Sequence, residues 1–191
     1  MSRGHPIMDG MRARSLLLGA LAASALAASP LSAQGFRAPR IPLSQLGSVS
    51  QDIAGTRIDI VYRRPVARGR KLFGSLVPFN QIWTPSADSA ATFTVSGPVE
   101  VNGKELPAGS YGLWAIPGER EWTVIFSRVA HVFHLDYPRN RDALRVQAAP
   151  TTGEQVETLT FAVPVADADS ALVQLRWGTT VVPLLIRVRR R

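Results

Sequence analysis

The sequence has 191 residues, of which 46% are hydrophobic, enough for one domain with a sizeable core. It contains no cysteine, which excludes disulfides and a lipid-modified cysteine at the N-terminus. The formal net charge is +8, which would favour an acidic partner such as an anionic envelope polymer or lipid head groups, although solvated loop and tail charges explain it more simply. No nucleic-acid-reading module is recognisable, so we expect no nucleic-acid partner.

The first segment has the features of a secretory signal. From Met11, two arginines precede an apolar run from Leu16 to Ala28, and small residues follow the run. This order is typical of a cleavable signal peptide, and the run is shorter than the roughly 20 apolar residues of a membrane span. We therefore expect residues 1–33 to be a signal peptide, with Met11 as the true start. The mature protein would then be periplasmic or secreted, with no membrane span.

Residues 34–50 are rich in Pro, Ser and Gly and are expected to form a flexible lead-in. In residues 51–188, runs of β-branched and aromatic residues recur between turn signals, the pattern of an all-β domain. The sequence thus predicts a single antiparallel β-sandwich or jelly-roll-like domain of about eight or nine strands. The main runs are 57–62, 92–95, 110–116, 121–127, 143–148, 156–165, 171–177 and 181–188.

Two turn signals predict hairpins. Asn102-Gly103 separates residues 99–101 from 105–106, and both turn residues accept positive φ. Pro117 to Arg120 should join the runs on either side of it as an antiparallel pair.

Three further features concern interruptions of the strands. Pro164 and Pro183 predict that their runs bend or lie at sheet edges, because proline cannot donate to a ladder. Asn80 to Ala90 is the best candidate for a short helix, limited by Pro85 to about one turn on either side.

The four tryptophans, which are Trp83, Trp114, Trp122 and Trp177, all lie on or beside predicted strands. An exposed row of them would suit stacking on sugar rings, but aromatic residues at strand positions are more often core. Strand alternation places Trp122, Val124 and Phe126 on one face, which we expect to be buried.

The candidate catalytic and metal-binding groups are few. His131 and His134 fall in one short segment with Asp136, and on a strand the two histidines would point to opposite faces. No second His or Cys group exists to complete a metal site, so no metal is expected. No Gly-x-Ser-x-Gly elbow and no phosphate-cradling Gly-rich loop occurs, so no nucleotide cofactor is expected either.

Three ordered blocks resemble a known family. Residues 62–83 (YRRPVARGRKLFGSLVPFNQIW), 101–118 (VNGKELPAGSYGLWAIPG) and 121–126 (EWTVIF) are similar to the blocks of the domain of unknown function 2911 family. The likeness covers roughly residues 50–186. It implies an exported bacterial β-rich protein with no established activity.

The resemblance also points to three departures. Relatives usually continue after the tryptophan with Arg, then Gly-Ala-Asn-Glu, a polar cluster suited to lining a pocket. This chain has Thr84 in place of the Arg, Asp88 in place of the Asn and Ser89 in place of the Glu. A function carried by the Arg and Glu in relatives would therefore be lost or altered here.

The candidate ligand-binding site consists of five residues: Arg64, Arg70, Lys71, Trp83 and Asp88. They could make a cationic, aromatic-rimmed cleft for an anionic or sugar-like ligand, or a structural network that fixes the loop onto the sheet. We expect a non-enzymatic envelope module that binds a small or polymeric ligand or a protein partner. The alternatives are a hydrolase with a carboxylate or histidine cleft, and a purely structural or assembly role.

Overall fold

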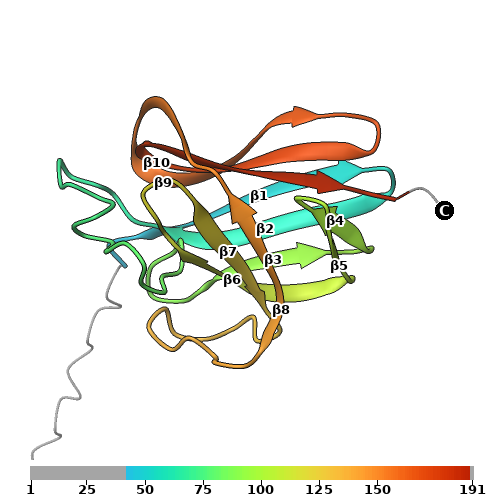
Figure 1. The fold of residues 1–191 in the computed structure, drawn as a ribbon, viewed down its shortest axis with the longest axis horizontal. Coiled ribbons are helices and arrows are strands. Elements are labelled where there is room, and N and C mark those ends of the chain that lie inside the picture. Colours follow the sequence, from blue (N-terminus) through green and yellow to red (C-terminus); the bar gives the residue numbers. More distant parts are fainter. Residues whose placement is uncertain (1–41, 190–191) are drawn as a thin grey trace, which may run out of the picture. The chain divides into compact units, whose positions relative to one another are not determined.

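The computed structural model describes residues 42–189 (Figure 1). They contain ten strands and no helix, so no helix in this part of the chain could span a membrane. The strands form two antiparallel sheets that pack as a sandwich, which confirms the predicted all-β class with slightly more strands than expected. The expected signal peptide lies outside the described residues.

One sheet has six strands in the order β1-β2-β3-β6-β7-β8, and the other has four in the order β5-β4-β10-β9. The strands are β1 Gln45–Ile53, β2 Thr56–Arg64, β3 Ala91–Val95, β4 Val99–Val101, β5 Lys104–Leu106, β6 Gly109–Ile116, β7 Trp122–Ser127, β8 Asp142–Ala148, β9 Thr151–Ala166 and β10 Ser170–Arg187.

Side-chain alternation decides which face of each strand is buried. In β2, Ile58, Ile60 and Tyr62 point into the space between the sheets, while Asp59 and Val61 point to the outer face. In β7 the predicted face of Trp122, Val124 and Phe126 is buried, as expected.

Both predicted hairpins are present. β4 and β5 pair across Asn102 and Gly103, which have φ values of 46° and 79°. β6 and β7 pair from Gly112 opposite Ser127 to Ile116 opposite Thr123. The turn chemistry of these two segments was therefore sufficient to predict their local pairing.

The last two predicted strands are one long strand. β10 runs through Gly178, whose φ of 60° accompanies register shifts against β9, so the chain bends without ending the ladder. Pro183 lies between the last residue paired with β9 and the first paired with β4, where its missing N–H breaks no ladder bond. Pro164 lies in β9, an edge strand, as predicted.

Two other sequence expectations need correction. β1 begins at Gln45, so residues 45–50, assigned by composition to the lead-in, are part of the six-stranded sheet. The short helix expected from Asn80 to Ala90 is absent. Trp83 instead pairs with Ala115 through two backbone hydrogen bonds of 2.8 and 2.6 Å, which attach this point of the segment to β6, and bends follow at residues 85–88.

A second, smaller core lies on the outer face of the six-stranded sheet. Trp114 and Ile125 are buried there under Val132 and Tyr137, and the Trp114 and Tyr137 ring centroids are 5.2 Å apart. These last two residues belong to segment 128–141, the connection between β7 and β8, which folds back over the sheet. At Gly112 a Cβ atom would collide with the carbonyl oxygen of Val129, so glycine allows this close approach.

Candidate functional site

The sequence-predicted site residues Arg64 and Arg70 donate hydrogen bonds within the fold, mainly to backbone carbonyls. The Arg64 Nε donates to the Leu159 carbonyl at 3.3 Å, and its Nη2 donates to the Thr160 hydroxyl at 2.9 Å. Arg70 donates to two carbonyls of its own loop, each at 2.8 Å. Arg64 therefore ties the end of β2 to β9, and Arg70 fixes the turn that follows.

Trp83 is also part of the architecture. It is half-buried and packs with Phe73, Trp122 and Trp177, with ring centroids 5.9 to 6.2 Å from its own. Trp114, Trp122 and Trp177 are buried, which confirms that these tryptophans are core rather than an exposed stacking row. Edge-to-face and offset contacts of this kind stabilise cores beyond the area they bury.

The five predicted site residues do not meet in one pocket. Arg70 lines a pocket of about 350 Å³ with Phe79, Thr179 and Thr180, whereas Asp88 lines a different and larger groove. Lys71 is exposed and lines neither of them.

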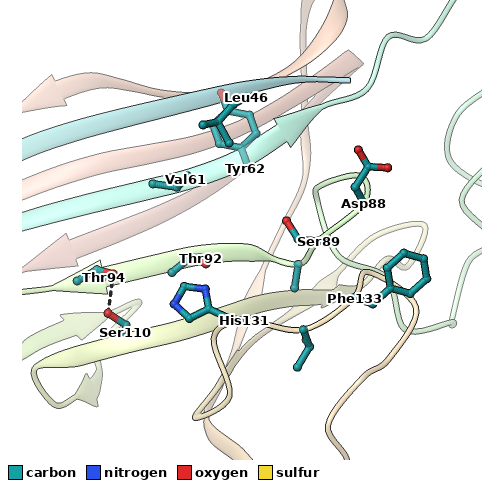
Figure 2. A pocket seen from close by; sticks show the side chains of 12 residues that line it. Leu46, Val61, Tyr62, Asp88, Ser89, Thr92, Thr94, Ser110, His131 and Phe133 are labelled. Atoms are coloured by element: carbon teal, nitrogen blue, oxygen red, sulfur yellow. Dashed lines mark hydrogen bonds between the residues drawn. The ribbon is translucent and has the colours of Figure 1, made fainter. Parts of the chain in front are cut away.

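The larger groove has a volume of about 650 Å³ and lies on the outer face of the six-stranded sheet (Figure 2). Strands β1, β2, β3 and β6 contribute to it, together with segment 87–90 and segment 128–141. The residues that line it are Leu46, Val61, Tyr62, Asp88, Ser89, Ala90, Thr92, Thr94, Ser110, His131, Val132 and Phe133.

The floor of the groove carries hydroxyl groups. Thr92 and Thr94 are outward positions of β3, and Ser110 is opposite Thr94 on β6. The hydroxyls of Thr94 and Ser110 are 2.9 Å apart and hydrogen-bonded. The floor thus offers donors and acceptors on a rigid sheet, in a fixed register.

The walls and rim are mainly apolar. Leu46, Val61 and Phe133 keep 63%, 40% and 52% of their surfaces exposed, which is high for residues of this type. Figure 2 shows Leu46 and Val61 on one side of the floor, and Phe133 on the side of segment 128–141. An exposed apolar cluster around a polar floor is typical of a binding surface.

Backbone pairing holds in place the wall that segments 87–90 and 128–141 form. Ala90 N donates to the Val132 carbonyl at 3.0 Å, Ser89 is bridged to Phe133, and His134 N donates to the Asp88 carbonyl at 3.4 Å. These bonds make a short ladder between segments 87–90 and 128–141 at one end of the groove.

A side-chain cluster fastens the same wall to β8. The Tyr137 hydroxyl donates to the Asp142 carboxylate, with oxygen distances of 2.6 and 2.8 Å, and Arg145 Nε donates to the same carboxylate at 2.7 Å. Burial, and then the hydrogen bond to Asp142, raise the pKa of Tyr137 above its usual value. The neutral phenol is thus the form that holds the wall.

The charge of the groove differs from the charge of the whole chain. None of the twelve lining residues is Lys or Arg, and Asp88 is the one carboxylate among them. The net positive charge of the sequence is therefore located elsewhere, and the groove favours a neutral or cationic ligand over an anionic one.

Sequence reasoning identified only part of this groove. Asp88 was named as a ligand-binding candidate and His131 as a metal or catalytic candidate, and both line it. The hydroxyls of Thr92, Thr94 and Ser110 were missed, although the predicted alternation of β3 already placed Thr92 and Thr94 on one face. No group of three metal-ligating side chains occurs within residues 42–189.

The three positions where the chain departs from its relatives' pattern are divided. Thr84 is buried, donates its hydroxyl to the Leu113 carbonyl at 2.7 Å and accepts from Ala91 N at 3.1 Å. Asp88 and Ser89 line the groove. Two of the three differences therefore lie in the groove, and the third, Thr84, lies in a buried contact with β6 and β3.

The fold and the groove define a class, an all-β sandwich with an open cleft on one sheet face. The chain belongs to the family described as protein of unknown function (DUF2911), whose model matches residues 44–186. Comparison with curated proteins and with solved structures found no match.

Proposed function

We propose that this protein is an exported, non-enzymatic module of a bacterial envelope that binds a saccharide without acidic groups in the groove. The observation that carries the proposal is the pairing of a hydroxyl-bearing floor with apolar walls, in a lining set without Lys or Arg. Export rests on the signal-like segment that begins at Met11.

A sugar ring matches this surface chemically. It has an apolar C–H face, which can pack on Phe133 or on Val61, and a hydroxyl edge, which can exchange hydrogen bonds with Thr92, Thr94 and Ser110. Because the groove is open rather than enclosed, a chain of several sugar units could pass through it. An anionic ligand would meet Asp88 and no cationic partner among the lining side chains.

One observation favours a hydrolase as a second candidate, since His131, Asp88 and Ser89 line the same groove. A nucleophile and its base need to lie within hydrogen-bond reach of each other. Within residues 42–189, no hydrogen bond joins His131 to a serine or a carboxylate, so we prefer binding without turnover.

Isothermal titration of the full chain with neutral oligosaccharides of glucose, xylose and N-acetylglucosamine tests the proposal. At least one series should bind, and Thr94→Val with Ser110→Ala should weaken its binding about tenfold, because two hydrogen bonds of about 0.5–1.5 kcal/mol each are removed. Thr123→Val is the matched control, since Thr123 lies on the same outer face, on β7, but does not line the groove.

The control should bind as well as the unaltered chain. Equal weakening by the double variant and by the control would place the ligand elsewhere. Absence of binding by all three series would refute the saccharide proposal, and release of shortened products would favour the hydrolase.

A further inference from the structure

One end of the groove combines a carboxylate with an exposed aromatic ring. Figure 2 shows Asp88 and Phe133 toward the same end, while Thr94 and Ser110 lie toward the other. The two residues come from segments that are paired, through the Ser89–Phe133 bridge and the bond from His134 N to the Asp88 carbonyl. The backbone pairing of these segments therefore keeps Asp88 and Phe133 at the same end of the groove.

The backbone at Asp88 is held in an unusual conformation. Its φ is 63°, in the left-handed region, where Asn and Asp are among the few non-glycine residues found often. The adjacent Ser89 N donates to the Ala87 carbonyl at 2.7 Å, which closes a tight turn at this point. The turn fixes the place from which the carboxylate extends, so little ordering is needed when a ligand binds.

No protein group within residues 42–189 pairs with the charge of Asp88. Asp59 is paired with Arg57, Asp142 with Arg145, and Glu105 with Arg189. Among residues 42–189, Asp88 makes no ion pair and its carboxylate accepts no hydrogen bond. Other surface carboxylates are also unpaired, but Asp88 is the one that lines the groove.

Phe133 supplies a second interaction that favours positive charge. The face of an aromatic ring attracts a cation, and with about half of its surface exposed Phe133 remains accessible to a ligand. A carboxylate and an aromatic face together select an ammonium group over a neutral hydroxyl or amide.

We propose that this end of the groove is a subsite for a protonated amino group, so that the preferred ligand is an amino sugar with a free amine. The inference rests on the proposed saccharide function and adds the class of sugar. The hydroxyl floor binds the sugar edge, the apolar walls cover its ring, and Asp88 with Phe133 binds the ammonium.

Three tetrasaccharides that differ at one substituent test the subsite by titration of the full chain at low salt. They are the glucosamine tetramer with free amines, its N-acetylated form and the neutral glucose tetramer. The free-amine form should bind about five- to thirtyfold more tightly than the other two, from an ion pair and a cation–π contact of about 0.5–1 kcal/mol each. The preference should shrink at 0.5 M salt, because exposed charges are screened.

Asp88→Asn should reduce the preference to the roughly two- to fourfold that the cation–π contact with Phe133 leaves, because it weakens the binding of the free-amine tetramer more than that of the neutral tetramer. Asp136→Asn is the matched control, an exposed carboxylate of segment 128–141 that does not line the groove, and it should keep the preference. Phe133→Leu keeps an apolar wall and should lower the preference about two- to fourfold, from loss of the cation–π contact alone.

Equal binding of the three tetramers, or a preference that Asp88→Asn does not diminish, would overturn the subsite and leave the saccharide proposal standing. Failure of all three to bind would contradict both.

Discussion

Two regions of the molecule differ in how they use their chemistry-bearing side chains. At the loop end, in residues 63–83, Arg64 and Arg70 donate to backbone groups and Trp83 packs among other aromatic rings. On the outer face of the six-stranded sheet, by contrast, Phe133 is half exposed and Asp88 has no ion pair within the described residues. The side chains of Arg64, Arg70 and Trp83 are therefore bound within the fold, whereas Asp88 and Phe133 remain accessible to a ligand.

The contrast shows that the charged and aromatic residues of a distinctive stretch can serve the fold itself. Arginines and tryptophans close together suggest recognition, yet these groups also meet the needs of a loop that must be fixed to two sheets. A binding groove needs only accessible side chains that can still accept or donate, and ordinary Thr, Ser and Phe residues line this one. Substitutions in the two regions should therefore separate stability from binding.

The largest expected effect is on stability at the loop end. Phe73→Ala removes a ring that contacts Trp83, Trp122 and Trp177, and should lower the free energy of unfolding by about 2–4 kcal/mol. The matched change Phe133→Ala, on the rim of the groove, should cost less than about 1 kcal/mol. Urea unfolding of both variants measures the difference, and similar losses would mean that the groove rim is also structural.

The next effect concerns the arginine that joins the two sheets. Arg64→Ala should cost about 1–3 kcal/mol, because the Leu159 carbonyl and the Thr160 hydroxyl lose a charged donor. Arg63→Ala is the control, a half-buried neighbour whose side chain makes no hydrogen bond within residues 42–189, and should cost less than about 0.5 kcal/mol. Thermal or urea unfolding measures the stability of both variants. An Arg64 variant as stable as the Arg63 variant would count against the tie between β2 and β9.

A smaller effect is expected where the wall of the groove is fastened. Tyr137→Phe removes the hydrogen bond to Asp142 and should lower stability by about 1 kcal/mol at pH 8. Because the folded pKa of Tyr137 is raised, the stability due to this group is present below pH 10 and is lost as the pH rises through the raised value.

The difference between the unaltered chain and the Tyr137 variant should therefore narrow above pH 10. Tyr111, whose pKa burial also raises, is present in both proteins and cancels from that difference. Urea unfolding at pH 8 and at pH 10.5 checks this, and a constant or growing difference would argue against a neutral phenol as the fastening group.

Much of the fold could be predicted from sequence because it depends on local pattern. Alternation identified β2 and β7, and Asn102-Gly103 identified the β4–β5 hairpin. Predictions failed where tertiary pairing outweighed local signals. Residues 171–177 and 181–188 were predicted as two strands, but pairing with β9 makes them one. A short helix was predicted from Asn80 to Ala90, but Trp83 pairs with β6 instead.

The groove was less predictable, for a topological reason. Leu46, Asp88 and Phe133 are brought together by three separate elements, and no spacing along the chain indicates that they meet. The site residues predicted at the loop end, by contrast, lie within one short stretch of the sequence. They were close in sequence and rich in charge, and sequence alone could not show that their donors are already bound to the backbone.

The central claim is that ligand binds at the groove and not at the loop end. The most direct measurement is an amide ¹H–¹⁵N spectrum of the full chain, recorded while the glucosamine tetramer is added. The account predicts shifts concentrated at Asp88 to Thr94, Ser110 and His131 to Phe133, with Arg70 and Thr180 unmoved. Shifts concentrated at Arg70, Phe79 and Thr180 instead would contradict it.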